Sequence, residues 1–476
     1  MKETWLRKLP SVDSLLGDEQ ARELIERFGR EALAKACRDA LDELRSEILK
    51  AGALESEEEA LSSERLFRKI EAQLQLRFSP SLQKAVNATG IIMHSGLGRA
   101  VLSEEARKAL DEVSRGYCTL ALEIETGRRG QRDSDVSRFL CELTGAEAAT
   151  LANNNAAATV LILNTLAKGK EVIVSRGQLV EIGGSFRMPE VMKTSGAALR
   201  EVGTTNKTHL RDYAEAINDN TGAILRVHHS NYRIVGFAEE PEIEELADLG
   251  NKRHVPVIDD LGSGALVDLQ EFGLQTEPLI GRSIRAGAAV ACFSGDKLIG
   301  GPQSGIIVGQ ADIISRIKKN PLARAFRCGK LTIAALEATL KLFLAPEKLR
   351  ERHPLYRMLS LSLENLEKRC RRVERALKKR LPAEVEVSVQ DGGSQVGSGA
   401  VPVETIPTKL LSLKAVSRPP DEIARELRFH KPPIFTRIHK EAVLFDFRTI
   451  QPDEENLIQE AILRIFEKTP GAKGHD

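Results

Sequence analysis

The sequence predicts an α/β protein whose central sheet is mostly parallel and covered by helices. In the middle of the chain short β-rich runs alternate with helical segments, and this alternation is typical of such sheets. The chain has 476 residues, more than one hydrophobic core usually serves, so we expect more than one domain. Hydrophobic residues make up 42% and charged residues 29%, the composition of a folded globular protein.

The N-terminal segment, residues 1–80, predicts a small helical domain. Apolar residues recur at helical spacing across residues 17–50, interrupted only by Gly29, which indicates one helix or a pair. A further charged helix is expected over residues 64–76. Because proline interrupts helices and favours turns, we place the domain boundary near Pro80.

Residues 81–344 carry the pattern of the α/β domain itself. The expected strands are the β-rich runs at residues 171–175, 223–227, 255–258, 288–293 and 305–308. Helical candidates lie between or before them, at residues 103–115, 155–166 and 241–249. The polar loops of this domain therefore fall at the ends of its strands.

The last segment, residues 345–476, predicts a smaller α+β domain. A strongly charged helix carries an apolar stripe at helical spacing. The stripe consists of Leu366, Cys370, Val373, Leu377 and Leu381. An alternating strand follows at residues 385–389, and another strand is expected at residues 442–447.

Charge and cysteine content exclude several classes of protein. Lys+Arg 69 against Asp+Glu 68 leaves a net charge of +1, so no general attraction to polyanions is expected and DNA is not an expected partner. The six cysteines stand singly, with no zinc-like spacing, so we expect neither disulfides nor a metal site. No segment resembles a signal peptide or the roughly 18 apolar residues of a membrane span, so we expect a cytoplasmic protein without a membrane partner.

Lys297 is the first candidate for chemistry. It stands in Phe293-Ser294-Gly295-Asp296-Lys297-Leu298-Ile299-Gly300-Gly301, after an expected strand and before two glycines. A lysine whose pKa is lowered by its neighbours can form a Schiff base with an aldehyde cofactor. A solvated loop lysine is the commoner meaning of such a segment. A nucleotide-binding P-loop is excluded, because there the lysine follows the glycines and opens a helix.

Three other segments at expected strand ends favour the cofactor interpretation. Asp260 lies 37 positions before that lysine, where an aspartate would keep a pyridine nitrogen protonated. Asn154 and Asn155 belong to a polar turn that opens a helix, and the free N–H groups there would bind a phosphate. Ser230 and Asn231 close a further strand, with groups able to bond the cofactor's 3′-oxygen. Such residues are usually turn and cap residues, so their order along the chain carries the argument.

Longer motifs identify a family. They are Asn87-Ala88-Thr89-Gly90, Leu97-Gly98-Arg99-Ala100, Glu125-Thr126-Gly127-Arg128-Arg129-Gly130, Asn153-Asn154-Asn155-Ala156-Ala157, Val174-Ser175-Arg176-Gly177, Glu181-Ile182-Gly183-Gly184-Ser185-Phe186-Arg187, Glu201-Val202-Gly203-Thr204-Thr205-Asn206, Phe293-Ser294-Gly295-Asp296-Lys297 and Pro321-Leu322-Ala323-Arg324-Ala325. In these motifs the sequence resembles the bacterial selenocysteine synthases, that is, the L-seryl-tRNA(Sec) selenium transferases. The resemblance runs from about residue 10 to about residue 465.

The resemblance implies a fold type I transferase, aspartate aminotransferase-like, that depends on pyridoxal 5′-phosphate and forms a homodecamer as a pentamer of dimers. It implies conversion of seryl-tRNA(Sec) to selenocysteinyl-tRNA(Sec) through aminoacrylyl-tRNA, with selenophosphate as the selenium donor. Lys297 and Ser294 then bind the cofactor, the freed lysine removes the α-proton, and Asp260 pairs with the pyridinium. Asp296 either tunes the lysine, assists loss of the β-hydroxyl, or is a turn residue.

Three arginines are candidates for the selenium-donor site. Selenophosphate is a tetrahedral oxyanion, and guanidinium groups make bidentate bonds to such anions. Arg99, Arg324 and Arg327 lie in or beside the matching motifs, so we assign them to the donor. A solvated helix face is the alternative for Arg324 and Arg327, which are three residues apart.

Two regions bear on tRNA binding. Residues 1–80 hold 14 Lys+Arg and 17 Asp+Glu, so general attraction to phosphate is not their role, whereas the family assigns this domain to recognition of the tRNA fold. The charged helix near residue 370 either contacts tRNA phosphate or presents a solvated face, since basic and acidic residues share it.

Two other functions stay open. One is a pyridoxal-phosphate-dependent lyase that acts on a small phosphorylated amino or sugar acid. Such a lyase would share the Lys297 segment, but we would not expect the helical domain before Pro80. The other is a catalytically silent tRNA-binding protein, which an intact Lys297 together with Asp260 disfavours.

Overall fold

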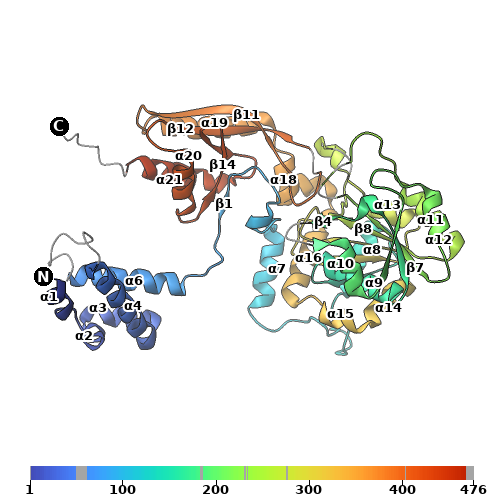
Figure 1. The fold of residues 1–476 in the computed structure, drawn as a ribbon, viewed down its shortest axis with the longest axis horizontal. Helices are drawn as coiled ribbons and strands as arrows, with labels where there is room; N and C mark the ends of the chain where they lie inside the picture. Colours follow the sequence, from blue (N-terminus) through green and yellow to red (C-terminus); the bar gives the residue numbers. More distant parts are fainter. Residues whose placement is uncertain are drawn as a thin grey trace. The chain divides into compact units, whose positions relative to one another are not determined.

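The computed structural model describes residues 2–49, 62–182, 186–229, 232, 234–274, 277–401 and 404–467. Its contacts divide the chain into two compact units, the first ending at Lys84 and the second beginning at Ala85 (Figure 1). The boundaries predicted near residues 80 and 345 stay predictions, and the second of them lies inside the larger unit. Within the described residues no helix is both long and apolar enough to cross a membrane.

The first unit is helical. Its described residues form α1 (Lys2–Arg7), α2 (Val12–Gly17), α3 (Glu19–Phe28), α4 (Arg30–Leu49) and α6 (Ser63–Phe78). Gly29, with a φ of 86°, separates α3 from α4, so the long periodic stretch is a pair of helices. Ser62 and Asp18 accept hydrogen bonds from the N–H groups that open α6 and α3, which supplies partners that a helix start lacks.

A seven-stranded sheet forms the centre of the second unit. Its order is β2-β10-β9-β8-β7-β3-β6. β10 runs antiparallel to both of its neighbours, and every other neighbouring pair is parallel. The strands are β2 (Ala148–Ala152), β3 (Glu171–Ser175), β6 (Ala198–Val202), β7 (Thr221–Val227), β8 (Val257–Gly262), β9 (Val290–Ser294) and β10 (Gly305–Gly309).

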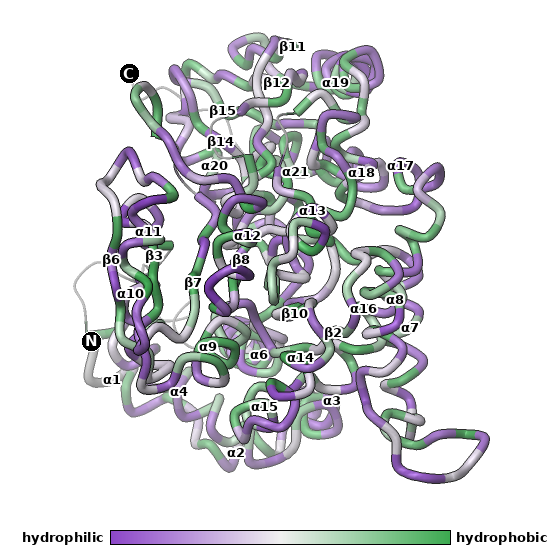
Figure 2. The backbone as a smooth tube through the Cα atoms, turned by 90° about the vertical axis from the view of Figure 1, so that its right-hand side faces the viewer, coloured by the Kyte–Doolittle hydropathy of each residue, from purple (hydrophilic) through white to green (hydrophobic). Residues whose placement is uncertain are grey.

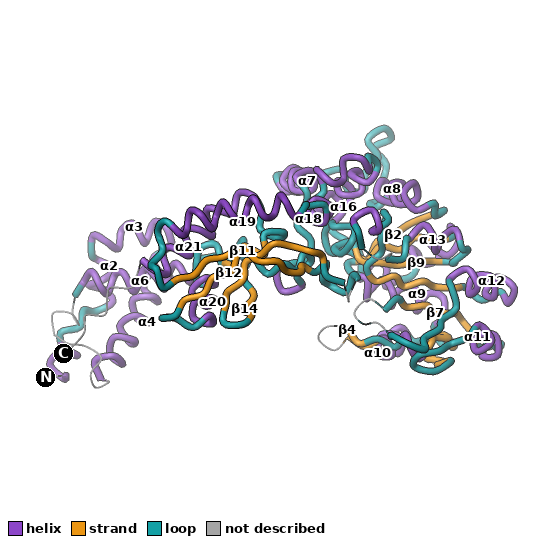
Figure 3. The backbone as a smooth tube through the Cα atoms, turned by 90° about the horizontal axis from the view of Figure 1, so that it is seen from above, coloured by secondary structure: helices purple, strands orange, loops and turns teal. Residues whose placement is uncertain are grey.

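Helices cover both faces of this sheet (Figure 3). The helices of this part of the unit are α7 (Glu104–Ser114), α8 (Ser134–Thr144), α9 (Asn155–Ala167), α10 (Met188–Ser195), α11 (Leu210–Ala216), α12 (Ile243–Arg253), α13 (Ile280–Arg285), α14 (Ala311–Lys319), α15 (Pro321–Ala325), α16 (Lys330–Phe343), α17 (Leu349–Arg352) and α18 (Pro354–Leu359). One buried cluster lies on the side of α8 and α16 and another on the side of α9 and α14. Strand β3 and helix α9 are among the hydrophobic segments in Figure 2, as burial on a covered sheet requires.

The C-terminal part of this unit holds a second sheet. Its order is β11-β12-β15-β14, and its strands are antiparallel. The elements are β11 (Val385–Ser394), β12 (Ile406–Ala415), β14 (Arg437–His439) and β15 (Ala442–Asp446), with α19 (Leu363–Lys378), α20 (Pro420–Arg428) and α21 (Glu455–Glu467). A further pair joins β1 (Val86–Asn87) to β13 (Ile434–Phe435), and β4 (Glu181–Ile182) pairs with β5 (Phe186–Arg187).

The predicted α/β class is confirmed, and within the large sheet the differences lie at the edge strands. In the second sheet β12 and β14 were not predicted either. Each predicted strand of the large sheet overlaps an observed one, but β2 and β6 were not predicted. β6 is an edge strand whose residues are largely exposed, so it lacks the apolar run that marks a buried strand. β2 is short and rich in alanine, which has a low strand propensity.

Candidate active site

Lys297 lies in a buried turn between β9 and β10, residues 295–301, which we call the lysine turn. The lysine itself is only 7% exposed. Burial lowers the pKa of Lys297, the Arg99 guanidinium lowers it further, and three carboxylates oppose both effects. Those carboxylates belong to Asp260, Asp296 and Glu277. The amine therefore loses its proton more easily than an ordinary lysine does, as a nucleophilic lysine must.

Asp260 lies on β8 and is held by donors. Its Oδ1 accepts from Asn155 Nδ2 at 2.8 Å and from the Gly262 N–H at 3.1 Å. Its Oδ2 accepts from Thr159 Oγ1 at 2.9 Å. Burial raises the pKa of Asp260, and these bonds together with nearby Lys297 oppose the rise. A buried carboxyl group fixed in this way can pair with a cationic ring N–H.

The start of α9 has the features of a phosphate site. The Asn154 side chain accepts from the Ala157 N–H at 2.8 Å and caps the helix. A Cβ added at Gly305 would lie 2.1 Å from the Asn154 carbonyl oxygen, so glycine allows β10 to approach this turn closely. Asn155 Oδ1 is buried and has no partner among the described residues. The free N–H groups of α9 suit an anion, and the orphaned oxygen suits a ligand that brings a donor.

Of three further predicted residues, the structure describes one, Ser294. Ser230 and Asn231 lie outside the described residues, so their contact with a 3′-oxygen stays a prediction. Ser294 is the last residue of β9, is 7% exposed, and pairs with Gly305 across the strands. Its place at the start of the lysine turn is compatible with the predicted cofactor contact, which also stays a prediction.

Arg99 and Asp296 meet beside the lysine. Arg99 Nη1 donates to Asp296 Oδ2 at 2.8 Å, and the Asp296 side chain is 11% exposed. Arg99 itself has a φ of 63°, a left-handed conformation that is rare for a residue with a side chain. The backbone strain places a guanidinium at the lysine turn, which is typical of functional positions.

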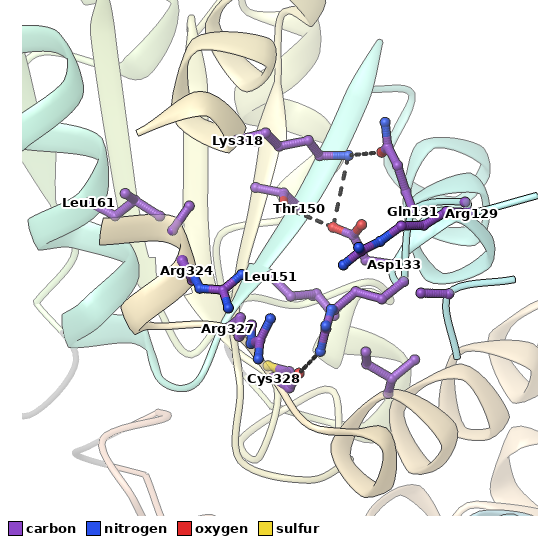
Figure 4. Close-up of a pocket in the computed structure, with 15 residues that line it drawn as sticks. Arg129, Gln131, Asp133, Thr150, Leu151, Leu161, Lys318, Arg324, Arg327 and Cys328 are labelled. Carbon is purple, nitrogen blue, oxygen red and sulfur yellow. Dashed lines mark hydrogen bonds and ion pairs between the residues drawn. The ribbon is translucent and has the colours of Figure 1, made fainter. Parts of the chain in front are cut away.

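Arg324 and Arg327 lie in a different place, a pocket of about 400 Å³ that we call the arginine pocket (Figure 4). Its charged lining residues are Arg129, Arg132, Asp133, Lys318, Arg324 and Arg327. Lys318 Nζ lies 3.8 Å from Asp133 Oδ2. The neighbouring arginines, Arg132 first, lower the pKa of Arg327, because cations that face one another disfavour their own charge.

The structure thus divides the three predicted donor-site arginines. Arg324 and Arg327 share one pocket, whereas the described residues lining that pocket do not include Arg99. Arg99 stays with Asp296 and Lys297. Both arginines are exposed, so the solvated-face alternative stays open beside the donor-site prediction. A joint role for all three arginines stays a prediction.

Sequence reasoning missed a histidine–glutamate pair near the lysine. His228 Nε2 lies 3.3 Å from Glu277 Oε2, which also accepts from Ser263 Oγ at 3.0 Å. Glu277 Oε1 accepts from the Val401 N–H at 2.6 Å. Burial raises the pKa of Glu277, but the bonds from His228 and the others outweigh it, and the pKa lies below its ordinary value. His228 lies two residues before Ser230, which the sequence singled out, whereas nothing in the sequence marked Glu277.

Thr159 was also missed, although a signal was present. It bonds Asp260 from α9, the helix that also carries Asn155. Residues four apart on a helix share a face. Because Asn155 faces Asp260, Thr159, four residues later on the same helix, can be expected to face Asp260 as well.

Comparison with known proteins finds matching family models and relatives in sequence. The family model described as L-seryl-tRNA selenium transferase matches residues 85–451, and the model described as selenocysteine synthase N terminal matches residues 6–45. The L-seryl-tRNA(Sec) selenium transferase of Alkaliphilus metalliredigens (strain QYMF) is 46% identical over 462 residues, covering 97% of this chain and 98% of that protein. The enzyme of the same name from Desulfomicrobium baculatum is 46% identical over 461 residues, with the same coverage of 97% and 98%.

Among solved structures, a D-glucosaminate-6-phosphate ammonia-lyase superposes with a TM-score of 0.56 and 19% identity, covering 82% of this chain and 99% of that one. At this identity the likeness concerns the fold alone, and with the mixed sheet it confirms the predicted fold type I class. The sequence relatives, in contrast, span nearly the whole chain at 46% identity. The chain therefore belongs to the L-seryl-tRNA selenium transferase family.

Proposed function

We propose that this chain converts L-seryl-tRNA(Sec) to L-selenocysteinyl-tRNA(Sec), with pyridoxal 5′-phosphate as cofactor and selenophosphate as selenium donor. Membership of the family supports the reaction and the cofactor. The single observation that carries the proposal is a buried Lys297 within electrostatic reach of a buried Asp260. That pair is what a Schiff-base cofactor with a pyridine nitrogen requires.

The residues around the lysine turn fit pyridoxal 5′-phosphate. When bound, this cofactor accepts the electrons that the α-carbon of the seryl group releases. The Asp260 carboxylate would accept a hydrogen bond from the protonated ring nitrogen. Its other side-chain hydrogen bonds also come from donors, as an ionised carboxylate requires. Asn154 and the start of α9 would bind the phosphate. Asn155, Ser230, Asn231 and Ser294 are our further candidates for contacts with the ring and its substituents.

Lys297 has two roles in this proposal. Its Nζ would hold the cofactor through the aldehyde carbon, and the same Nζ would serve as the base for the α-proton of the seryl group. The lowered pKa of Lys297 favours both roles. Asp296 holds Arg99 at the site, and it is our candidate to assist departure of the β-hydroxyl. The turn is buried throughout, and a buried site suits chemistry from which water must be kept away.

The arginine pocket is our candidate for the selenium donor. Arg324 and Arg327 lie there with Arg129 and Arg132, and the pocket holds more cations than carboxylates. Guanidinium groups bind tetrahedral oxyanions in bidentate fashion. Arg99, at the lysine turn, is placed to meet the donor where it reacts. A selenium nucleophile released from selenophosphate would then add to the β-carbon.

The helical first unit is our candidate for recognition of tRNA(Sec). Its excess of acidic over basic residues makes recognition by shape the better account than general attraction to phosphate. Arg22, Arg30, Arg38 and Arg45 are exposed on α3 and α4 and are the expected contacts. We further propose a cytoplasmic homo-oligomer, a decamer built as a pentamer of dimers, as the resemblance implies.

A filter-binding and conversion assay tests the proposal. The purified protein should retain seryl-tRNA(Sec) but not ordinary seryl-tRNA(Ser), and it should form selenocysteinyl-tRNA(Sec) when selenophosphate is added. Retention of both tRNAs, or of neither, would instead favour a lyase that acts on a small phosphorylated molecule.

Removal of the first unit tests the tRNA assignment. A chain lacking residues 1–80 should stay folded, yellow and oligomeric but should lose tight binding of seryl-tRNA(Sec). Because the unit neutralises few phosphates, the affinity that it adds should fall only gently with salt. A truncated chain that binds and converts the tRNA as well as the full chain would contradict this assignment.

A further inference from the structure

The lysine turn is a buried loop whose carbonyl groups need donors. All of residues 295–301 are buried. Two N–H groups, those of Gly300 and Gly301, donate at 2.8 Å to carbonyls within the turn. The carbonyls of Leu298 and Ile299 accept instead from side chains outside it. Because an unpaired buried carbonyl is costly, those outside donors help to determine the conformation of the turn.

Both donors come from one short stretch of the chain. Tyr356 Oη donates to the Leu298 carbonyl at 2.9 Å, and His353 Nε2 lies 3.0 Å from the Ile299 carbonyl. His353 caps α18 and Tyr356 lies within it. Both residues are fully buried. The two carbonyls that directly follow Lys297 are thus held side by side by residues more than fifty positions later in the sequence.

His353 is a neutral donor that fits the turn closely. Burial lowers the pKa of His353 to about 4, so the ring is neutral near pH 7. Because a carbonyl only accepts, the ring hydrogen is on Nε2. Gly300 has a φ of 65°, and a Cβ added there would lie 2.2 Å from His353 Cε1. The turn therefore approaches the ring as closely as glycine allows.

Neighbouring aromatic rings fix the two donors. The Phe343 ring centroid lies 5.4 Å from that of His353 and 5.8 Å from that of Tyr356, both at steep angles. The Phe272 ring lies 5.3 Å from that of Tyr356. Rings packed on several sides keep one rotamer. The donors therefore act as a rigid clamp, a name we use for His353 and Tyr356 together.

We propose that His353 and Tyr356 are positioning residues for Lys297, fixing where its amine stands by holding the two carbonyls that follow it. The inference rests on the proposed role of Lys297 as the residue that binds the cofactor. The clamp's hydrogen bonds given above go to backbone carbonyls of the turn, and the described residues lining the arginine pocket include neither His353 nor Tyr356. Four charged groups act electrostatically on the amine, and the clamp keeps it at a fixed place relative to them. They are Arg99, Asp260, Glu277 and Asp296.

A pH titration of the holoenzyme's visible absorption tests the clamp, because the band reports the protonation of the nitrogen that joins Lys297 to the cofactor. Tyr356→Phe and His353→Leu each remove one donor. Each should shift the titration midpoint by up to about one unit and lower kcat by up to about tenfold, as loss of one hydrogen bond predicts. KM for seryl-tRNA(Sec) should stay unchanged. His353→Gln, which keeps a donor, should restore both readouts toward those of the original chain.

Tyr213→Phe is the matched control, since Tyr213 is fully buried in a separate core cluster. It should alter neither the titration nor kcat. Clamp variants that keep the original titration, or that change no more than this control, would overturn the inference. If His353→Leu does not fold, Tyr356→Phe decides, because it removes a single oxygen. Borohydride mapping separates the failures: cofactor fixed on another lysine overturns the proposed function and the clamp with it, whereas cofactor on Lys297 with an unshifted titration overturns the clamp alone.

Discussion

The lysine turn and the arginine pocket treat charge in opposite ways. In the turn the buried Lys297 lies within electrostatic reach of three carboxylates and one arginine, and that arginine is itself paired with Asp296. In the pocket several guanidiniums lower the pKa of Arg327, and Asp133 is the carboxylate that lines it. Balanced charge in a buried site favours one fixed geometry for covalent chemistry, whereas uncompensated charge in an open pocket favours binding of an anion.

The sharpest way to break this comparison is Lys297→Ala. We expect the yellow colour of the purified protein and all conversion of seryl-tRNA(Sec) to be lost, because the imine nitrogen comes from this residue. Absorption spectroscopy and the conversion assay measure the two effects. Lys341→Ala is a control, since that exposed lysine pairs with Glu337 on the surface of α16. A pyridoxyl group mapped after borohydride reduction to any other lysine would show that the site is misplaced.

The sequence alone could predict those residues of the lysine site that a local pattern marks. Lys297, Asp260 and Asn155 stand at strand ends or helix starts, where a polar residue breaks an apolar pattern and can be noticed. The structure brings them into one site. Glu277 could not be predicted, because its role depends on contacts to His228 and Val401 that lie far away in the sequence. The clamp was hidden for the same reason, since His353 and Tyr356 act through backbone carbonyls that have no sequence signature.

The charged helix α19 shows the opposite case, in which a visible sequence pattern did not decide between two roles. Its arginines and lysines left tRNA contact and a solvated face equally open. In the structure Arg369 and Arg372 both bond Glu455 of α21, and Arg371 and Lys378 bond Glu374 on the same helix. Arg369 is 8% exposed. Several of these charges therefore hold α19 in its place, which no count of charges along one helix could predict.

Acid should weaken the buried side of the comparison through His353. An unfolded histidine has a pKa near 6.5, and burial lowers the pKa of His353 to about 4. Above pH 6.5 both states are neutral and the stability is fully present. As the pH falls from about 6.5 toward about 4, His353 becomes protonated in the unfolded chain but stays neutral in the folded chain. The free energy of unfolding should fall by about 3 kcal/mol over this range.

Urea unfolding at pH 7 and at pH 4.5 measures this effect. His353→Gln provides the reference, because it keeps a donor but has no group that titrates. Carboxylates such as Glu277, whose pKa is lowered, also contribute less to the free energy of unfolding in acid. This loss is equal in both chains. The two chains should therefore differ in how far the free energy of unfolding falls from pH 7 to pH 4.5, and that difference is due to His353. An equal fall in the free energy of unfolding in both chains would contradict the assignment of a neutral buried ring.

The open side of the comparison is tested by Arg324→Ala and Arg327→Ala. Each should weaken use of selenophosphate by roughly ten- to a hundredfold, because one charge-assisted pair with the donor is lost. Dehydration of the seryl group and the yellow colour should stay largely intact, since the described residues lining the arginine pocket include neither Lys297 nor Asp260. Arg316→Ala removes the same charge from an exposed position on α14 that does not line the pocket, and it should have little effect. An equal loss of the dehydration step would show that the pocket serves the tRNA or the cofactor instead, and the contrast between a balanced site for chemistry and an uncompensated site for the donor would then fail.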